Sequence, residues 1–192
     1  GGGWYGGFAP VSDGAGGARL GIFLYHIPPV AQVGISYALI ERLLDAYPGI
    51  IAGIKDSSGD WQHTQGLLTR FAPSGFEVFA GSESFLLATL RGGGAGCISA
   101  TANVNPGPIA ALAREWSAPD ADARQARLDV VRGIFQRRAM IPALKRAVAE
   151  YGGDAGWARV RPPLVELDGS EAAALRAELD AAGFDMPGLR GA

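Results

Sequence analysis

Short apolar runs alternate with longer amphipathic segments between residues 19 and 116 of the chain. The runs are rich in apolar residues and end at glycine, proline or a polar turn, which predicts buried strands over residues 19–25, 50–55, 76–80 and 97–99. Apolar residues recur at helical spacing after each run, which predicts helices over residues 35–47, 61–71, 82–90 and 105–116.

Four consecutive strand–helix units predict an α/β fold with a parallel sheet covered by helices. The remaining chain is mainly helical, with helices predicted over residues 120–138, 142–151 and 170–182. A complete (β/α)8 barrel typically needs about 250 residues. We therefore expect a partial TIM barrel, with four β/α units over residues 19–118 and a C-terminal helical region over residues 119–192.

The N-terminal segment, the net charge and the cysteine content limit the kinds of protein that the chain can represent. Residues 1–17 contain 8 glycines, so residues 1–18 are expected to be a flexible lead-in. No methionine precedes Met140, which suggests a fragment of a longer protein. A net charge of −2 with interspersed signs favours neither nucleic acid nor a membrane as partner. The single cysteine, Cys97, fits a reducing, cytoplasmic compartment.

Lys55 is the strongest candidate for chemistry. Only Lys55 and Lys145 are lysines among 17 Lys and Arg residues. Lys55 ends an apolar strand, where parallel α/β folds place their sites, and burial beside that strand favours the neutral amine. A lysine amine can form an imine with a carbonyl, whereas a guanidinium cannot. The alternative is a lysine that reaches solvent or pairs with Asp56 or Asp60.

Tyr25 is predicted to lie beside Lys55. The two residues are 30 positions apart, which is one β/α unit, so both fall at the carboxyl ends of adjacent strands. A phenol in that position can transfer protons to and from a reacting carbonyl. Strand alternation places Asp56 on the opposite side of the sheet from Lys55. The alternative for Tyr25 is an aromatic residue whose hydroxyl binds backbone.

Four motifs at strand ends resemble those of the dihydrodipicolinate synthase/N-acetylneuraminate lyase family of pyruvate-type class I aldolases. The resemblance extends from about residue 19 to about residue 165. The motifs occur in the family's order: Tyr25-His26-Ile27-Pro28, Gly53-Ile54-Lys55-Asp56-Ser57-Ser58-Gly59-Asp60, Gly81-Ser82-Glu83 and Gly96-Cys97-Ile98-Ser99-Ala100-Thr101-Ala102-Asn103.

The resemblance implies strands five to eight of a (β/α)8 barrel with appended helices, in a homo-oligomer. It implies that Lys55 forms the imine, that Tyr25 moves protons, that the Ile98 carbonyl contacts the imine region, and that Gly81 and Glu83 read substrate hydroxyls. The expected partners are a 2-oxo acid and an aldehyde, without a cofactor.

Structural alternatives exist for several of these residues. Gly81 can serve only a turn, and Glu83 can complement a helix dipole. His26 and His63 lack metal-ligand spacing, so we expect no metal site, with His63 on an exposed helix face and His26 packed near the barrel mouth. Lys145, in a helix, is expected to be a surface charge.

Three departures from the family limit the functional reading. The Gly-Thr-Thr-Gly-Glu motif that holds the substrate carboxylate is absent, and so is the tyrosine that a neighbouring subunit contributes in many members. Val30 occupies the place of an arginine that binds a second carboxylate in the lysine-biosynthesis branch. This argues for a different aldehyde, derived from a sugar acid.

Two classes of function follow. The first is a Schiff-base lyase or aldolase that acts on pyruvate or a related 2-oxo acid, with this chain as part of the working enzyme. The second is a truncated, non-catalytic half-barrel that acts only in assembly, since unpaired sheet edges invite association.

Overall fold

A computed structural model describes residues 21–189 of the chain. The flexible lead-in predicted for residues 1–18 lies outside the described residues. The fold divides into two compact units, of which the first ends at Ile98 and the second begins at Ser99. The fourth β/α repeat is therefore shared, with its strand in the first unit and its helix in the second.

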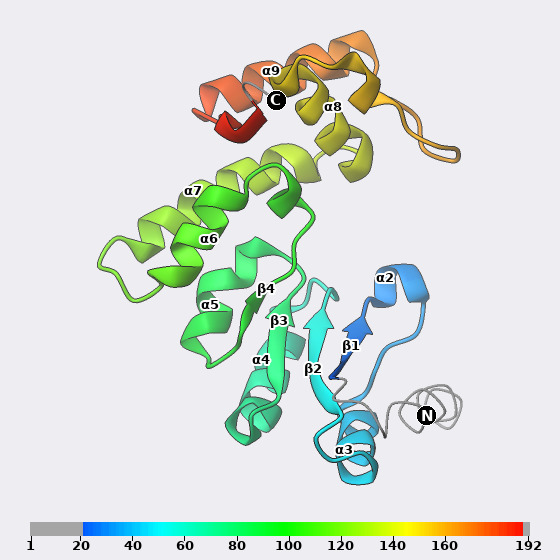
Figure 1. The fold of residues 1–192 in the computed structure, drawn as a ribbon, viewed down its shortest axis with the longest axis vertical. Coiled ribbons are helices and arrows are strands. Elements are labelled where there is room, and N and C mark those ends of the chain that lie inside the picture. Colours follow the sequence, from blue (N-terminus) through cyan, green and yellow to red (C-terminus); the bar gives the residue numbers. More distant parts are fainter. Residues whose placement is uncertain (1–20, 190–192) are drawn as a thin grey trace. The chain divides into compact units, whose positions relative to one another are not determined.

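The first unit is built on a parallel sheet of four strands in the order β1-β2-β3-β4, each paired with its sequence neighbour (Figure 1). This confirms the predicted strand direction and order. The strands are β1 (Ile22–His26), β2 (Ile51–Asp56), β3 (Glu77–Ala80) and β4 (Gly96–Cys97).

Helices cover one face of this sheet. Their apolar residues pack against Leu24, Ile54 and Val78, which point to that face from three successive strands. The Ser36 hydroxyl accepts a hydrogen bond from the backbone N–H of Leu39 at the start of α3, which sets its first turn. The helices after the strands are α3 (Tyr37–Ala46), α4 (Trp61–Phe71) and α5 (Leu86–Arg91).

Within the described residues of the first unit, these helices do not cover the other face of the sheet, which we call the open face. Strand alternation turns Phe23 and Tyr25 to this side, and their side chains are 46% and 49% exposed. The next residues along β1, Leu24 and His26, are buried on the helix-covered side. Lys55 shares the open face and is partly exposed. The candidate catalytic residues Tyr25 and Lys55 therefore face away from the helices that cover the sheet.

Short helical segments depart from the predicted boundaries. A four-residue helix, α2 (Pro28–Ala31), follows β1, where the sequence predicted only that the strand ends. Proline at the first helical position favours such a start. The helix predicted to begin at residue 82 begins as a 3-10 segment, η2 (Glu83–Phe85), before α5. Another such segment, η1 (Ala72–Ser74), extends α4.

The second unit is helical, and it contains helices in the three regions predicted after residue 119. Its core is formed by apolar residues of α7, α8 and α9, including Phe135, Leu144 and Leu175. Asn105 precedes α6 and is of a residue type that often caps helices, but its side chain makes no capping hydrogen bond. The elements are η3 (Thr101–Asn103), α6 (Pro106–Arg114), α7 (Ala121–Gln136), α8 (Met140–Gly152), η4 (Ala155–Ala158), α9 (Gly169–Ala181) and η5 (Pro187–Leu189).

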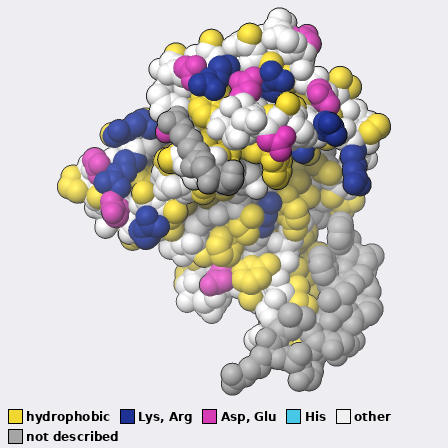
Figure 2. Space-filling model, turned by 45° about the horizontal axis from the view of Figure 1, so that its top comes forward, with side chains coloured by type: hydrophobic (Ala, Val, Ile, Leu, Met, Phe, Trp, Pro, Cys, Tyr) yellow, Lys and Arg dark blue, Asp and Glu magenta, His cyan; other side chains and the backbone are white. Residues whose placement is uncertain are grey.

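Charged side chains of both signs lie next to one another on the face drawn in Figure 2. In the second unit Arg138 pairs with Glu178 at 2.6 Å, and Arg146 pairs with Glu150 at 2.7 Å. On this face the described residues therefore form a mixed surface of both signs. Within residues 21–189, none of the helices combines the length and the apolar character that crossing a bilayer requires.

Candidate active site

Lys55 and Tyr25 meet on the open face of the sheet. They are direct partners in the register between β1 and β2. The Lys55 amine donates a hydrogen bond to the Tyr25 hydroxyl over 3.0 Å, and its nitrogen lies 4.1 Å from the centroid of the tyrosine ring. The 30-residue spacing therefore produces a direct contact between the two groups.

The surroundings of Tyr25 change its acidity. Burial raises the pKa of the Tyr25 phenol, but hydrogen bonds with Lys55 and Ser57 and the positive charge of Lys55 outweigh this, so the pKa lies below its usual value. A phenol of this kind gives up its proton more readily than tyrosine in water. The pair therefore places a lysine amine, which can act as a nucleophile when it is neutral, next to a phenol that can exchange a proton.

The other predicted site residues occupy different surroundings. Gly81 lies against β2: its N–H donates to the Asp56 carbonyl over 2.6 Å, and a Cβ on Gly81 would approach two backbone atoms, the Asp56 carbonyl oxygen and the Ser57 Cα, to 2.7 Å. Glycine is therefore required there by packing. The Glu83 side chain is buried at the start of η2, and Ile98 is 47% exposed after β4, with its N–H bound to the Ala80 carbonyl.

Three positions in the structure bear on the structural alternatives that the sequence left open for these residues. Glu83 does lie in the first turn of a helical segment, as the dipole interpretation requires. Lys145 lies over the Trp157 ring at 5.5 Å, within the second unit. Of the predicted site residues, the structure brings Lys55 and Tyr25 into direct contact.

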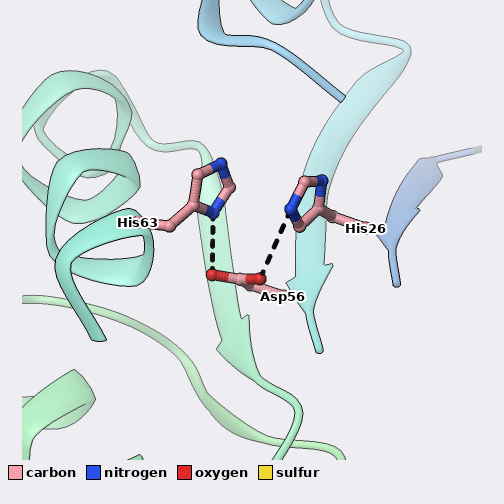
Figure 3. Close-up of side chains that lie close together, drawn as sticks. All are labelled: His26, Asp56 and His63. Carbon is pink, nitrogen blue, oxygen red and sulfur yellow. Dashed lines mark hydrogen bonds and ion pairs between the residues drawn. The ribbon is translucent and has the colours of Figure 1, made fainter. Parts of the chain in front are cut away.

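A second group of polar side chains lies on the helix-covered face behind this pair. His26 and Asp56 are the residues that follow Tyr25 and Lys55, and they too are register partners. His63 reaches them from α4, with its Nδ1 3.0 Å from the Asp56 Oδ2, while the His26 Nε2 is 4.0 Å from the Oδ1 (Figure 3). Asp56 faces away from Lys55, as predicted, and the two histidines lie together beside it, which their sequence spacing did not indicate.

The structure corrects the expectation for His63, whose side chain is only 21% exposed. His26 is packed at the end of β1, as expected, and faces the helix-covered side of the sheet. The two imidazole rings stack with their centroids 4.2 Å apart. Sequence spacing missed this group because the three residues come from a strand end, a second strand end and a helix.

The same three side chains resemble a metal site, since their ligand atoms lie within 4.8 Å of one another. The hydrogen bond at His26 opposes that use. The backbone N–H of Ile35 donates to the His26 Nδ1 over 2.9 Å, so the proton of a neutral ring is on Nε2. A protonated Nε2 cannot bind a cation. The group is therefore a hydrogen-bonding cluster, which we call the His–Asp–His cluster.

The charges of the cluster follow from its contacts. Burial raises the pKa of Asp56, but hydrogen bonds from His63, Ser58 and Thr64 outweigh it and hold the pKa below its usual value. Burial lowers the pKa of His26, repulsion from His63 lowers it further, and the Asp56 charge only partly opposes them. The cluster thus contains an ionised Asp56 and a neutral His26.

The lowered pKa of His26 predicts that acid destabilises the fold. The unfolded chain takes up a proton at His26 near pH 6.5, while the folded chain resists until its lower pKa is reached. This contribution to stability is complete above about pH 6.5 and is lost as the pH falls through the folded pKa. Urea unfolding at several pH values between 7 and 5 measures the loss.

His26→Asn is the matched variant for that measurement. An asparagine Oδ1 can accept the Ile35 N–H in place of the imidazole Nδ1 but does not titrate. The variant is expected to show a flatter dependence of the free energy of unfolding on pH. An unchanged dependence would assign the acid sensitivity to other groups.

Comparisons with known proteins place the chain among enzymes of one family. The model of the dihydrodipicolinate synthetase family matches residues 17–182. An uncharacterized DapA-like lyase from Chloroflexus aurantiacus is 36% identical over 157 residues, which cover 81% of this chain and 52% of that protein. A 4-hydroxy-tetrahydrodipicolinate synthase from Methanoculleus marisnigri is 33% identical over 159 residues, 81% of this chain and 53% of that protein.

Comparisons with solved structures lead to the same family. The dihydrodipicolinate synthase from Agrobacterium tumefaciens has a TM-score of 0.81 at 32% identity, with 94% of this chain and 60% of that chain covered. An E. coli prophage protein of the dihydrodipicolinic acid synthase family, solved in complex with pyruvate, has a TM-score of 0.80 at 27% identity, with 92% and 60% covered. The chain spans about half the length of the curated relatives it matches.

Proposed function

The chain belongs to the dihydrodipicolinate synthetase family, and we propose that it supplies the imine-forming part of a class I lyase or aldolase that acts on pyruvate or a related 2-oxo acid. The contact between the Lys55 amine and the Tyr25 hydroxyl carries this proposal. It unites a nucleophile and an acid–base group at the ends of adjacent parallel strands, on the open face of the sheet.

The proposed reaction begins at Lys55. Its neutral amine adds to the carbonyl carbon of the 2-oxo acid and forms a carbinolamine, which loses water to give an iminium ion. Loss of a proton from the neighbouring carbon gives an enamine, which attacks an aldehyde, and the reverse steps cleave the same carbon–carbon bond. Tyr25 donates the proton that leaves with the carbinolamine oxygen as water.

We also propose that β1 to β4 correspond to strands five to eight of a (β/α)8 barrel. The parallel order of the four strands and the 60% coverage of the Agrobacterium enzyme support this assignment. The family's Gly-Thr-Thr-Gly-Glu motif is not in this sequence. A backbone cradle for the substrate carboxylate is a large part of such a site, so we place full activity with a complete barrel.

The aldehyde partner is proposed to lack a second carboxylate near Val30. This residue lies in α2 and its side chain is 74% exposed, and it offers no charge to a substrate. An arginine in that position would bind a carboxylate through two hydrogen bonds. An aldehyde derived from a sugar acid, rich in hydroxyls, suits the position better than the substrate of lysine biosynthesis.

A second candidate function is assembly without catalysis. The apolar side chains on the open face favour it: Phe23 is 46% exposed, and Ile98 is 47% exposed. Such a surface gains stability when another chain covers it. In this case the protein would serve as a module that pairs with another chain or with a copy of itself.

Reductive trapping separates the two functions. The protein is incubated with pyruvate and borohydride, and the modified peptide is mapped by mass spectrometry. Since Lys55 and Lys145 are the only lysines in the sequence, peptide mapping assigns each lysine adduct to one of two positions and separates it from an adduct at the terminal amine. We expect the adduct at Lys55. An adduct at Lys145 alone would overturn the assignment, and an adduct at Lys55 only in a longer form of the chain would identify this form as the inactive part.

A further inference from the structure

The His–Asp–His cluster lies directly behind the proposed catalytic pair. Tyr25 and Lys55 are register partners on the open face, and His26 and Asp56 are the next partners along the same two strands, facing the helices. Each proposed catalytic residue is therefore joined by a peptide bond to a residue of the cluster. A shift of the Asp56 backbone would move the Lys55 backbone with it.

Asp56 joins the end of β2 to three other parts of the first unit. Its Oδ1 accepts the backbone N–H of Ser58 over 3.0 Å, and its Oδ2 accepts the Thr64 hydroxyl over 2.7 Å. Its carbonyl accepts the N–H of Gly81 over 2.6 Å, and the next residue, Ser57, donates its N–H to the His26 carbonyl over 2.7 Å. These bonds fix the turn that follows Lys55.

Thr64 has few contacts through its side chain apart from the hydrogen bond to Asp56. Its side chain is buried on α4, where the hydroxyl also reaches the Asp60 carbonyl at 3.3 Å. The Asp60 carbonyl already accepts the Thr64 N–H. The short bond to Asp56 is therefore its distinctive contact, and it ties the helix to the end of β2.

We propose that Asp56 and Thr64 are positioning residues, which hold the end of β2 so that the Lys55 amine faces the Tyr25 hydroxyl. This inference rests on the proposed function. Neither side chain touches the substrate, because both are buried on the other side of the sheet from Lys55. Removal of a donor from a buried carboxylate leaves it incompletely bonded, and the turn shifts to compensate.

Thr64→Val tests this role with little change of shape. Valine replaces the hydroxyl with a methyl group, whereas Thr64→Ser retains the hydroxyl and loses the methyl group. Thr69→Val is a control on the same helix, where the exposed hydroxyl binds the Gln65 carbonyl at 3.0 Å. Circular dichroism and thermal unfolding establish that each variant is folded. Asp56→Asn serves as a second variant if Thr64→Val does not fold.

The first readout is the rate of borohydride trapping at Lys55 with pyruvate. Misplacement of a reacting group by about 1 Å can cost a factor of about 100 in rate. We expect Thr64→Val to slow trapping roughly 10- to 100-fold, while Thr64→Ser and Thr69→Val remain near the wild-type rate. An effect on stability alone would leave the rate per folded molecule unchanged.

The second readout needs no pyruvate. NMR of protein labelled at the tyrosine ring carbon that bears the hydroxyl follows each tyrosine through its titration, and Tyr25→Phe identifies the Tyr25 signal. The Lys55 contact helps to hold the Tyr25 pKa below its usual value. In Thr64→Val the Tyr25 pKa is expected to rise toward about 10, while Thr64→Ser and Thr69→Val leave it low.

The two readouts distinguish failure of this inference from failure of the proposed function. If the wild-type protein forms no adduct but Thr64→Val raises the Tyr25 pKa, positioning holds and the proposed function fails for this chain. If Thr64→Val traps pyruvate at the wild-type rate with an unchanged Tyr25 titration, the positioning role is overturned. A slow Thr64→Val that Thr64→Ser does not restore would overturn the role of the hydroxyl.

Discussion

Lys55→Arg is expected to abolish the covalent adduct with pyruvate. A guanidinium retains its proton at every accessible pH and does not form an imine with a carbonyl, so the variant keeps the positive charge beside Tyr25 and loses the nucleophile. Borohydride trapping followed by peptide mapping should fall below detection at position 55. The size of this effect exceeds that of any other single substitution considered for the chain.

Lys145→Arg is the matched control for that experiment. Lys145 is the other lysine of the sequence and lies over the Trp157 ring in the second unit. Its replacement removes the alternative site of modification and should leave the adduct at Lys55 in full. An adduct that persists in Lys55→Arg and disappears in Lys145→Arg would transfer the proposed chemistry to the second unit and contradict the role of Lys55.

The sequence was sufficient to predict the order of the strands and the contact between Tyr25 and Lys55. Apolar runs of three to seven residues that end at turns located all four strands, and a spacing of one β/α unit predicted that Tyr25 and Lys55 would meet. Both inferences depend on short-range patterns and on the regular advance of parallel strands. The period of two in a strand likewise predicted that Asp56 would face away from Lys55.

The His–Asp–His cluster could not be predicted in the same way. His63 comes from α4, and its distance from His26 depends on how that helix rotates and packs against the sheet. Tyr37 stacks on His63 at 5.2 Å and donates its hydroxyl to the His63 carbonyl, which adds a third element to the arrangement. The relevant signal was the register: once Tyr25 faced Lys55, His26 had to face Asp56.

Local propensity was a weaker guide at helix ends. Asn105 has the residue type of a helix cap and precedes a proline, yet its side chain makes no capping bond and is 7% exposed. Its burial shows that packing decides its conformation. By contrast, Asp168 caps α9 through a capping box with Glu171, where both residues are exposed and free to adopt the preferred geometry.

Tyr25→Phe is expected to slow imine formation at Lys55 without abolishing it. The phenylalanine ring keeps the surface beside the Lys55 amine but has no hydroxyl to receive its hydrogen bond or to exchange protons with the carbinolamine. Loss of a positioned acid–base group typically costs a factor of roughly 10² to 10⁴. The rate of borohydride trapping with pyruvate measures this loss, and Tyr151→Phe, in the second unit, serves as the control.

The pH dependence of trapping provides a sharper form of the same prediction. Since the Tyr25 pKa lies below its usual value, the wild-type rate should change at a pH below about 10, where the phenol loses its proton and can no longer act as an acid. Tyr25→Phe should lack this change. A Tyr25→Phe variant with the wild-type rate and the wild-type pH profile would contradict proton transfer by Tyr25 and leave Lys55 to act with water alone.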